Sequence, residues 1–148
     1  MNPLLGIDLG TVRIGLAISD ELHLLAHPLA TISAKENVVK RIAEVVRDKK
    51  IESIIVGIPR KMSGEIGSAA ADALAFVDKL RKALPTVGVI TWDERLTTAA
   101  AHRALQEAGR KTRATRRYVD QVAAQMILQG YLDRQHELAN QSQASREM

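Results

Sequence analysis

Asp8 is a carboxylate within a stretch whose pattern is that of a buried β-strand. Two apolar runs, 4–9 and 12–20, are separated by Gly10 and Thr11, a pattern that predicts a β-hairpin. Because side chains alternate along a strand, Asp8 shares its face with two glycines. A buried carboxylate is costly unless it is hydrogen-bonded, ion-paired or metal-bound, and the glycines leave room for an ion or a phosphate backbone. The alternative is that Asp8 accepts hydrogen bonds from the hairpin backbone.

Two more carboxylates, Asp93 and Glu94, stand where the predicted strand 87–92 ends. In open α/β sheets this carboxyl end of a strand is where ligands bind. Asp93 or Thr97 can instead cap the helix that follows, while a neighbour faces the site. Both interpretations stay open, and Asp93 is also a candidate for a fourth ligand, as is Asp20.

Asp120 lies on the apolar face of a predicted helix. Over 118–134 this face also carries Ala123, Ala124 and Ile127. A charge on a packing face belongs either to an ion pair or to a functional site. The alternative is a carboxylate in the first helical turn, which the helix dipole favours by only ~0.3–1 kcal/mol.

Positive charges gather just before Asp120 along the chain, and two more follow another predicted strand. The residues concerned are Arg110, Lys111, Arg113, Arg116 and Arg117 in the first group and Arg60 and Lys61 in the second. Such a run is usually a solvated loop, but here it would place cations beside a carboxylate cluster. A basic rim around an acidic centre suits a nuclease, because Lys and Arg hold phosphates while carboxylates hold metal.

Three converging carboxylates repel one another, and protonation or a divalent cation must relieve that repulsion. The four histidines share no ligand-like spacing, and ligation by oxygen alone favours Mg²⁺ or Mn²⁺. Two such ions about 3.5–4 Å apart would activate a water and stabilise the leaving oxygen of a phosphodiester.

The composition is that of a soluble globular domain. The chain has 148 residues, 46% hydrophobic and 26% charged, which fits one domain. It contains no cysteine, which excludes disulfides and Cys-ligated metal sites and is compatible with a reducing cytoplasm. We see no membrane span or signal peptide, and we expect a cytoplasmic protein. The net charge of +4 is modest and agrees with a polyanionic partner.

The elements alternate in a way that predicts an α/β fold. Strands are expected at 4–9, 12–20, 21–33, 51–58 and 87–92, and helices at 35–49, 68–84, 97–108 and 118–134. Pro28 places the third strand at an edge, and Ser68 is a candidate cap for the second helix. The order β-β-β-α-β-α-β-α, with one further helix, predicts a mixed five-stranded sheet with helices on both faces. The domain is expected over 1–134, and the polar tail 135–148 is expected to be disordered.

Four motifs together resemble the YqgF/RuvX family of Holliday-junction-resolvase-like proteins, from about Leu4 to Asp133. They are Gly6-Ile7-Asp8-Leu9-Gly10-Thr11, Val56-Gly57-Ile58-Pro59, Trp92-Asp93-Glu94-Arg95-Leu96-Thr97-Thr98, and Val119-Asp120 with Ala123-Ala124. The chain departs from the family at 60–64, where Leu-Asn-Met-Asp-Gly is usual, and at Val12, where Lys is common. Neither departure touches the three carboxylates.

The resemblance implies an RNase H-like fold and a nuclease that processes the 5′ end of bacterial pre-16S rRNA. It implies Asp8, Glu94 and Asp120 as the catalytic, metal-binding carboxylates. Other candidates for substrate contact are Thr11, Arg13 and Arg95, beside the basic residues already named. With one Phe, one Trp and two Tyr, the chain lacks an aromatic platform for bases, so recognition is expected to rest on backbone charge and shape.

Other functions share part of this sequence pattern. The Gly-Ile-Asp-Leu-Gly-Thr motif also opens actin-like ATPase domains, which need two lobes where this chain supplies one. A resolvase of four-way DNA would use the same carboxylates and work as a stable dimer. A non-catalytic RNA-binding assembly factor would have no reason to tolerate the carboxylate repulsion. We expect a monomer or weak homodimer that acts on RNA, with the ribosomal precursor particle positioning the substrate.

Overall fold

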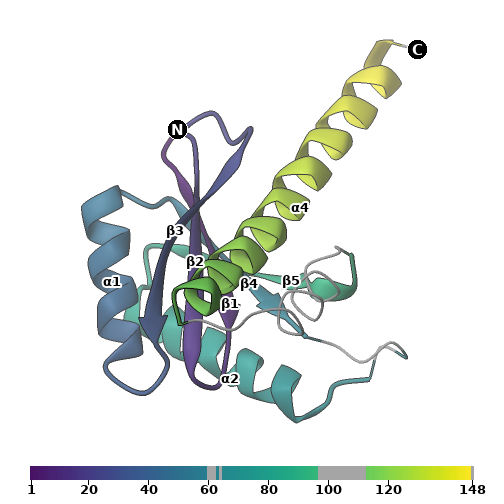
Figure 1. The fold of residues 1–148 in the computed structure, drawn as a ribbon. Coiled ribbons are helices and arrows are strands. Elements are labelled where there is room, and N and C mark those ends of the chain that lie inside the picture. The colour runs from purple at the N-terminus through teal and green to yellow at the C-terminus, as the bar shows by residue number, and fades with distance from the viewer. Residues whose placement is uncertain (60–62, 64, 97–112, 148) are drawn as a thin grey trace.

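The five strands form one mixed sheet in the order β3-β2-β1-β4-β5 (Figure 1). The computed structural model describes residues 1–59, 63, 65–96 and 113–147, and the side chains of 113–117 and 147 lie outside that description. The strands are β1 (Leu4–Leu9), β2 (Arg13–Ser19), β3 (Ala26–Ser33), β4 (Ser53–Ile58) and β5 (Gly88–Asp93). β2 is antiparallel to its neighbours β1 and β3, and β4 and β5 run parallel to β1.

The position of each strand in the sheet follows from its sequence. β4 is a nearly continuous run of β-branched residues and is buried along almost its whole length, as expected for a parallel strand covered on both faces. β3 contains Pro28, which cannot donate to a ladder, and it forms one edge of the sheet. The predicted edge position of this strand is therefore confirmed.

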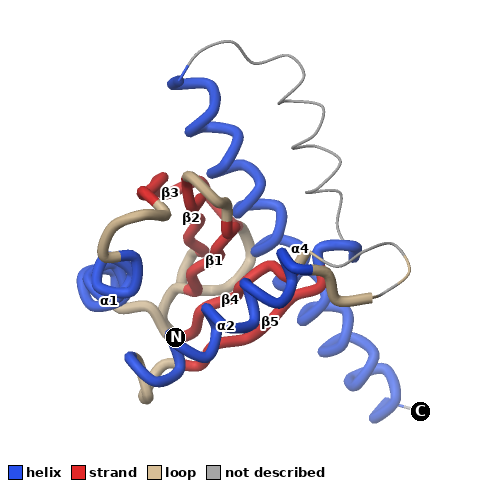
Figure 2. The backbone as a smooth tube through the Cα atoms, turned by 90° about the horizontal axis from the view of Figure 1, so that it is seen from below, coloured by secondary structure: helices blue, strands red, loops and turns tan. Residues whose placement is uncertain are grey.

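Helices cover both faces of the sheet, as predicted. α1 (Val38–Lys49) and α2 (Ser68–Ala83) lie on one face, and α4 (Arg113–Glu147) crosses the other (Figures 1 and 2). Each interface has its own apolar core: Ile7 and Ile54 belong to the α1–α2 side, whereas Ile55 and Ile127 belong to the α4 side. Within the part of the chain that the structure describes, no helix is both long and apolar enough for a bilayer crossing.

The ends of two helices differ from the sequence prediction. Gly67, not Ser68, occupies the N-cap of α2, and it offers no side-chain hydrogen bond. α4 begins at Arg113, five residues before the predicted start, because the segment before Tyr118 contains no helix-breaking residue.

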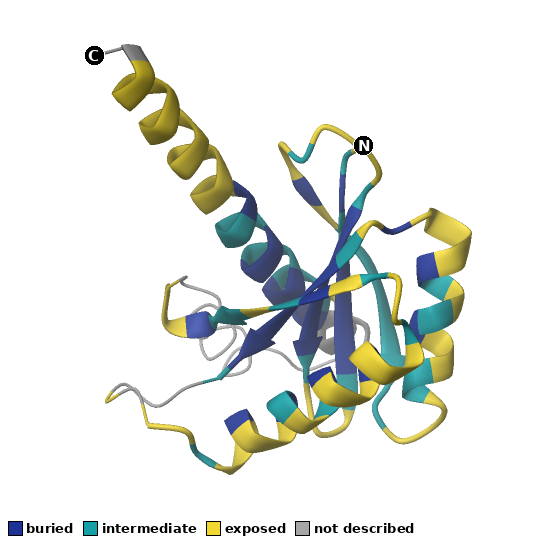
Figure 3. Cartoon of the chain, turned by 180° about the vertical axis from the view of Figure 1, so that it is seen from behind, coloured by how far each residue is buried: buried dark blue, intermediate teal, exposed yellow. Residues whose placement is uncertain are grey.

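α4 also continues beyond its predicted end. The sequence predicts a disordered tail from residue 135, but the helix continues to Glu147 and projects past the sheet with its side chains exposed (Figure 3). The segment 135–147 lacks Gly and Pro, so its backbone is compatible with helix even though it has no packing face.

Glycines on β1 and β2 bring α4 close to the sheet. A Cβ at Gly6 would lie 2.8 Å from Cβ of Leu128 and 3.0 Å from the carbonyl oxygen of Ala124, and one at Gly15 would overlap the carbonyl of Asp120. The space beside Gly6 is therefore filled by the helix, which corrects the expectation that it admits an ion or a phosphate. The close approach fixes the height at which α4 presents Asp120.

Candidate active site

Three carboxylates are the buried charged side chains of the described part of the chain. Asp8 is 5% exposed, Glu94 4% and Asp120 7%. These are the residues for which the sequence predicts a catalytic and metal-binding role. Because charged side chains are seldom fully buried without a partner or a function, their shared burial marks this region as a candidate active site.

Asp8 occupies the centre of this region. It pairs in register with Gly15 of β2, and its neighbour Ile7 pairs with Val56 of β4, so Gly57 lies beside Asp8 on the other side. Residues paired across neighbouring strands point to the same face of a sheet, and for these three it is the α4 face. The carboxylate of Asp8 therefore stands between two positions that have no side chain.

Asp120 and Glu94 stand over those two glycines. The backbone of Asp120 lies against Gly15, and the Cγ of Glu94 lies 3.2 Å from the position of a Cβ at Gly57. Glu94 opens a short 3-10 helix, η1 (Glu94–Leu96), directly after β5. Carboxylates from a strand, a helix and a turn thus come together on one face, although they are far apart in the sequence.

Arg13 is the ion-pair partner of Asp120. Its Nε donates to Oδ2 of Asp120 across 2.7 Å, and the two side chains are 26% and 11% exposed. Arg13 begins β2 and Asp120 lies in α4, so the pair ties the helix to the strand. The sequence pattern predicts Arg13 as a candidate contact for substrate. It does not predict this pairing, because the two residues are 107 positions apart.

The donor set suits a hard divalent cation in its chemistry, because it is made of buried carboxylate oxygens. Among the described residues, however, no three His, Cys, Asp or Glu side chains are grouped closely enough to hold an ion. Asp120 is directed to Arg13. The fold brings the carboxylates to one face of the sheet.

The candidates for a fourth ligand lie elsewhere. Asp20 follows the far end of β2, where its Oδ1 accepts hydrogen bonds from the N–H groups of Leu24 and Leu25, at 2.7 and 3.0 Å. The hydrogen bonds from Leu25 and Leu24 lower the pKa of Asp20. This carboxylate stabilises a turn, and the structure does not support it as a ligand.

Asp93 caps η1, the short helix that follows β5, while its neighbour Glu94 is buried. The predicted helix 97–108 and Thr97, the other candidate for its cap, lie outside the described residues. Oδ1 of Asp93 accepts the N–H of Arg95 at 3.0 Å, and Oδ2 accepts Nη2 of the same residue at 2.6 Å. The side-chain hydrogen bond to Asp93 raises the pKa of the Arg95 guanidinium. Asp93 pairs in register with Ile58, whose side chain belongs to the α1–α2 core, so it lies on the face opposite Asp8.

The structure describes some of the other candidate substrate contacts and not others. Thr11 is exposed in the turn between β1 and β2. The predicted helix 97–108 and four basic residues, Arg60, Lys61, Arg110 and Lys111, lie outside the described residues. Arg113, Arg116 and Arg117 stand in the first turns of α4 and not in the predicted loop.

The signal for two glycines of this site was present in the sequence. Gly15 and Gly57 interrupt otherwise apolar strands, and a glycine inside a strand often marks a close approach of another group. The structure shows what approaches them, namely the backbone of Asp120 and the side chain of Glu94.

Comparisons with known proteins identify the family of the chain. The sequence model of the RuvX family, described as Holliday junction resolvase, matches residues 2–134. A candidate pre-16S rRNA nuclease of Nocardia farcinica is 47% identical over 137 residues, which cover 87% of this chain and 76% of the relative. A candidate pre-16S rRNA nuclease of Acetivibrio thermocellus is 46% identical over 132 residues, covering 87% of this chain and 94% of the relative.

Solved structures agree with the fold. The structure of RuvC from Thermus thermophilus matches with a TM-score of 0.56 and 15% identity, covering 91% of this chain and 96% of that one. The same protein in complex with a Holliday junction substrate matches with a TM-score of 0.54 and 16% identity, covering 87% and 92%. The expected RNase H-like sheet is thereby confirmed. On the sequence matches, the chain belongs to the RuvX family of nucleases.

Proposed function

We propose that this chain is a nuclease that hydrolyses phosphodiester bonds with the help of a divalent metal, and that Asp8, Glu94 and Asp120 hold the metal. The observation that carries the proposal is the burial of these three carboxylates around Gly15 and Gly57 on one face. Removing charges from water is expensive, and a cluster of like charges adds repulsion. A bound cation offsets both costs.

We expect the ions to be Mg²⁺ or Mn²⁺, because all the candidate donors are oxygens. The expected number of ions is two. When bound, such ions activate a water and stabilise the charge that develops on the leaving oxygen. Asp8 supplies the rigid part of the site, since it is held within the central strand β1. Glu94 and Asp120 approach it from η1 and α4.

Arg13 has a positioning role in this proposal. Its guanidinium holds Oδ2 of Asp120, and a metal ion held by the same carboxylate would compete with it. If Asp120 held an ion, Arg13 would be free to hold a phosphate of the substrate, a group that the planar guanidinium binds well. The predicted substrate contact and the observed ion pair are then two positions of one side chain.

The substrate that we propose is the 5′ region of the 16S ribosomal RNA precursor. The support is that relatives 46–47% identical to this chain are named as candidate pre-16S rRNA nucleases. Basic residues before Asp120 supply phosphate contacts, and the ribosomal precursor particle, in the cytoplasm, supplies positioning. Recognition of the phosphate backbone by these charges makes cleavage strongly dependent on salt.

Branched DNA is the second candidate substrate, because the family model is described as Holliday junction resolvase. A resolvase cuts two strands symmetrically and therefore needs a stable two-fold dimer. Symmetric cleavage of a four-way junction by a dimer would favour this candidate over RNA.

The test compares the wild type with Asp8→Asn in Mg²⁺ and in Mn²⁺, on a model of the precursor 5′ end and on a four-way DNA junction. Asp48→Asn is the matched control, because Asp48 is 67% exposed on α1 and makes the same change of charge. We expect cleavage of RNA by the wild type and the control, and none by Asp8→Asn.

The outcomes separate the proposed functions. Cleavage that persists in excess chelator contradicts the metal mechanism. Cleavage of neither substrate, by a folded chain that still binds Mn²⁺ and RNA, contradicts the nuclease proposal and favours a non-catalytic assembly factor.

A further inference from the structure

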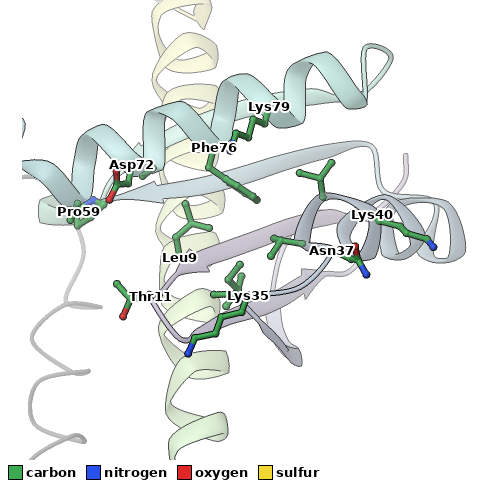
Figure 4. A pocket seen from close by; sticks show the side chains of 16 residues that line it. Leu9, Thr11, Lys35, Asn37, Lys40, Pro59, Asp72, Phe76 and Lys79 are labelled. Carbon is green, nitrogen blue, oxygen red and sulfur yellow. The ribbon is translucent and has the colours of Figure 1, made fainter.

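A cavity of about 680 Å³ lies between α1, α2 and the turn that joins β1 to β2 (Figure 4). Its apolar lining includes Leu9, Ile14 and Val38, and the ring of Phe76 extends into it from α2. Phe76 is the single phenylalanine of the chain, and it is half-buried. An apolar cavity of this size can accept a planar organic group of about the size of a nucleobase with its sugar.

The rim of the cavity is positively charged. Lys35, Lys40 and Lys79 line it and are exposed, and one carboxylate, Asp72, lies among them. Among the residues that the structure describes, none of these lysines forms an ion pair. The rim therefore suits an anion such as a phosphate, while the interior suits an apolar ring.

The start of α1 adds to this charge. Asn37 stands at the N-cap in the left-handed region, with φ of 49°, and its side chain makes no capping hydrogen bond. No acidic residue lies in the first turn of the helix. The N–H groups of this turn are therefore available to an anion at the rim, in support of the lysines.

The cavity lies at the carboxyl end of β1, near the carboxylates, but on the opposite face of the sheet. Leu9 lines the cavity and directly follows Asp8, and the side chains of successive strand residues point to opposite faces. The exposed residues Gly10 and Thr11 form the turn between the two faces and also line the cavity. A strand of nucleic acid that leaves the carboxylates can cross this turn into the cavity.

We propose that the cavity binds one unpaired nucleotide of the RNA substrate, with the base against Phe76 and the neighbouring phosphates on Lys35, Lys40 and Lys79. This inference rests on the proposed nuclease function and adds a substrate subsite to it. An unpaired base is required because the bases of a duplex are stacked inside the helix and cannot reach an aromatic ring. Cleavage is then selective for RNA that is single-stranded on one side of the scissile bond.

The first test measures the binding of a labelled unpaired oligoribonucleotide and of a duplex of the same length to the full chain in chelator. Phe76→Leu keeps an apolar side chain but removes the ring, and it should weaken binding of the unpaired RNA about tenfold. Phe76→Tyr keeps the ring and should bind as the wild type does. Binding of the duplex should change in neither variant.

The second test concerns the lysines. For the unpaired RNA, the double variant Lys40→Gln with Lys79→Gln should reduce the magnitude of the slope of log association constant against log salt by about 1.4, because two phosphate contacts are lost. The matched control is Lys49→Gln with Lys82→Gln, which removes the same charge from the same two helices outside the cavity. The control should keep the wild-type slope.

A third measurement locates the nucleotide directly. RNA that carries 5-iodouridine, irradiated with the wild-type chain, should crosslink to the peptide that contains Phe76. Crosslinks confined to other peptides overturn the proposal.

The results separate this inference from the proposed function. If Phe76→Leu and the lysine variants bind RNA as the wild type does while the wild type still cleaves, the subsite is wrong and the nuclease stands. If Phe76→Leu weakens binding but no substrate is cleaved, the subsite stands and the nuclease fails. Equal affinity for a free mononucleotide and for the oligomer overturns the assignment to an RNA strand, as does binding of a fatty acid in place of RNA.

Discussion

The two faces of the sheet are packed by different kinds of residue. On the α4 face, glycines meet the helix backbone, and the buried carboxylates lie there. On the α1–α2 face, large side chains such as Leu5, Leu16 and Ile42 fill the interface, and a cavity remains at one edge. One face allows little movement of its helix, and the other has room for a ligand.

This difference separates two tasks. Carboxylates that share a metal must be held to within a fraction of an ångström, and a backbone seated on glycine gives that accuracy. A site that takes unpaired nucleotides of any sequence needs space and charge, and an apolar cavity with a lysine rim gives those. Substitutions on the α4 face test whether it is as tightly determined as its packing indicates.

The largest expected effect is that of Gly15→Ala. A Cβ at Gly15 would overlap the backbone carbonyl of Asp120, which cannot move without α4. We expect the free energy of unfolding to fall by about 3 kcal/mol, the upper end of the range for overpacking, and nuclease activity to be lost with it. Urea unfolding measures the first and cleavage assays the second.

Gly88→Ala is the control for this prediction. The nearest atom to its Cβ is Oγ of Ser53, at 3.0 Å, and that side chain can rotate away. Its effect should stay below about 1 kcal/mol. Equal effects of the two substitutions would show that α4 is not seated on β2 as tightly as described.

An intermediate effect is expected from the Arg13–Asp120 pair. A double-mutant cycle with Arg13→Gln and Asp120→Asn should give a coupling of about 1–3 kcal/mol, because Asp120 is largely buried and its partner is close. The exposed pair Arg47–Asp48, with atoms 3.5 Å apart, is the control and should couple by less than about 1 kcal/mol.

The same variants test the competition between Arg13 and metal. Mn²⁺ should raise the melting temperature of Arg13→Gln more than that of the wild type, since Asp120 is then free to bind the ion. A smaller rise in Arg13→Gln would show that Arg13 assists metal binding and does not oppose it.

The sequence predicted what local pattern can encode. Asp8 in a strand and Asp120 on an apolar helix face stand out because each breaks its own periodicity, and both are buried in the structure. The pairing of Arg13 with Asp120 depends on the packing of α4 against β2, which no local pattern records. Gly6 shows a further limit, because a glycine that admits an ion and one that admits a helix give the same sequence signal.

Segment 135–147 shows where a sequence pattern fails to predict a helix. Segment 135–147 has no apolar periodicity, so sequence reasoning predicts disorder, yet the structure continues the helix there without a packing partner on the sheet. Periodicity reports burial and not helix itself, and an exposed helix lacks the signal that identifies the others.

The smallest expected effect concerns Tyr131, which lies in α4 and packs against the core on that face of the sheet. Its ring meets Trp92 edge-on, with centroids 6.2 Å apart, and burial raises the pKa of its hydroxyl above the ordinary 10.0. Because the folded state disfavours the ionised form, the stability due to this tyrosine is complete below pH 10.0 and is lost as the pH rises through the folded-state value. Urea unfolding between pH 8 and 11 should show a loss in the wild type that Tyr131→Phe reduces. Tyr118→Phe, at a position 61% exposed on the same helix, should keep the wild-type loss, and an equal reduction in both variants would contradict the assignment to Tyr131.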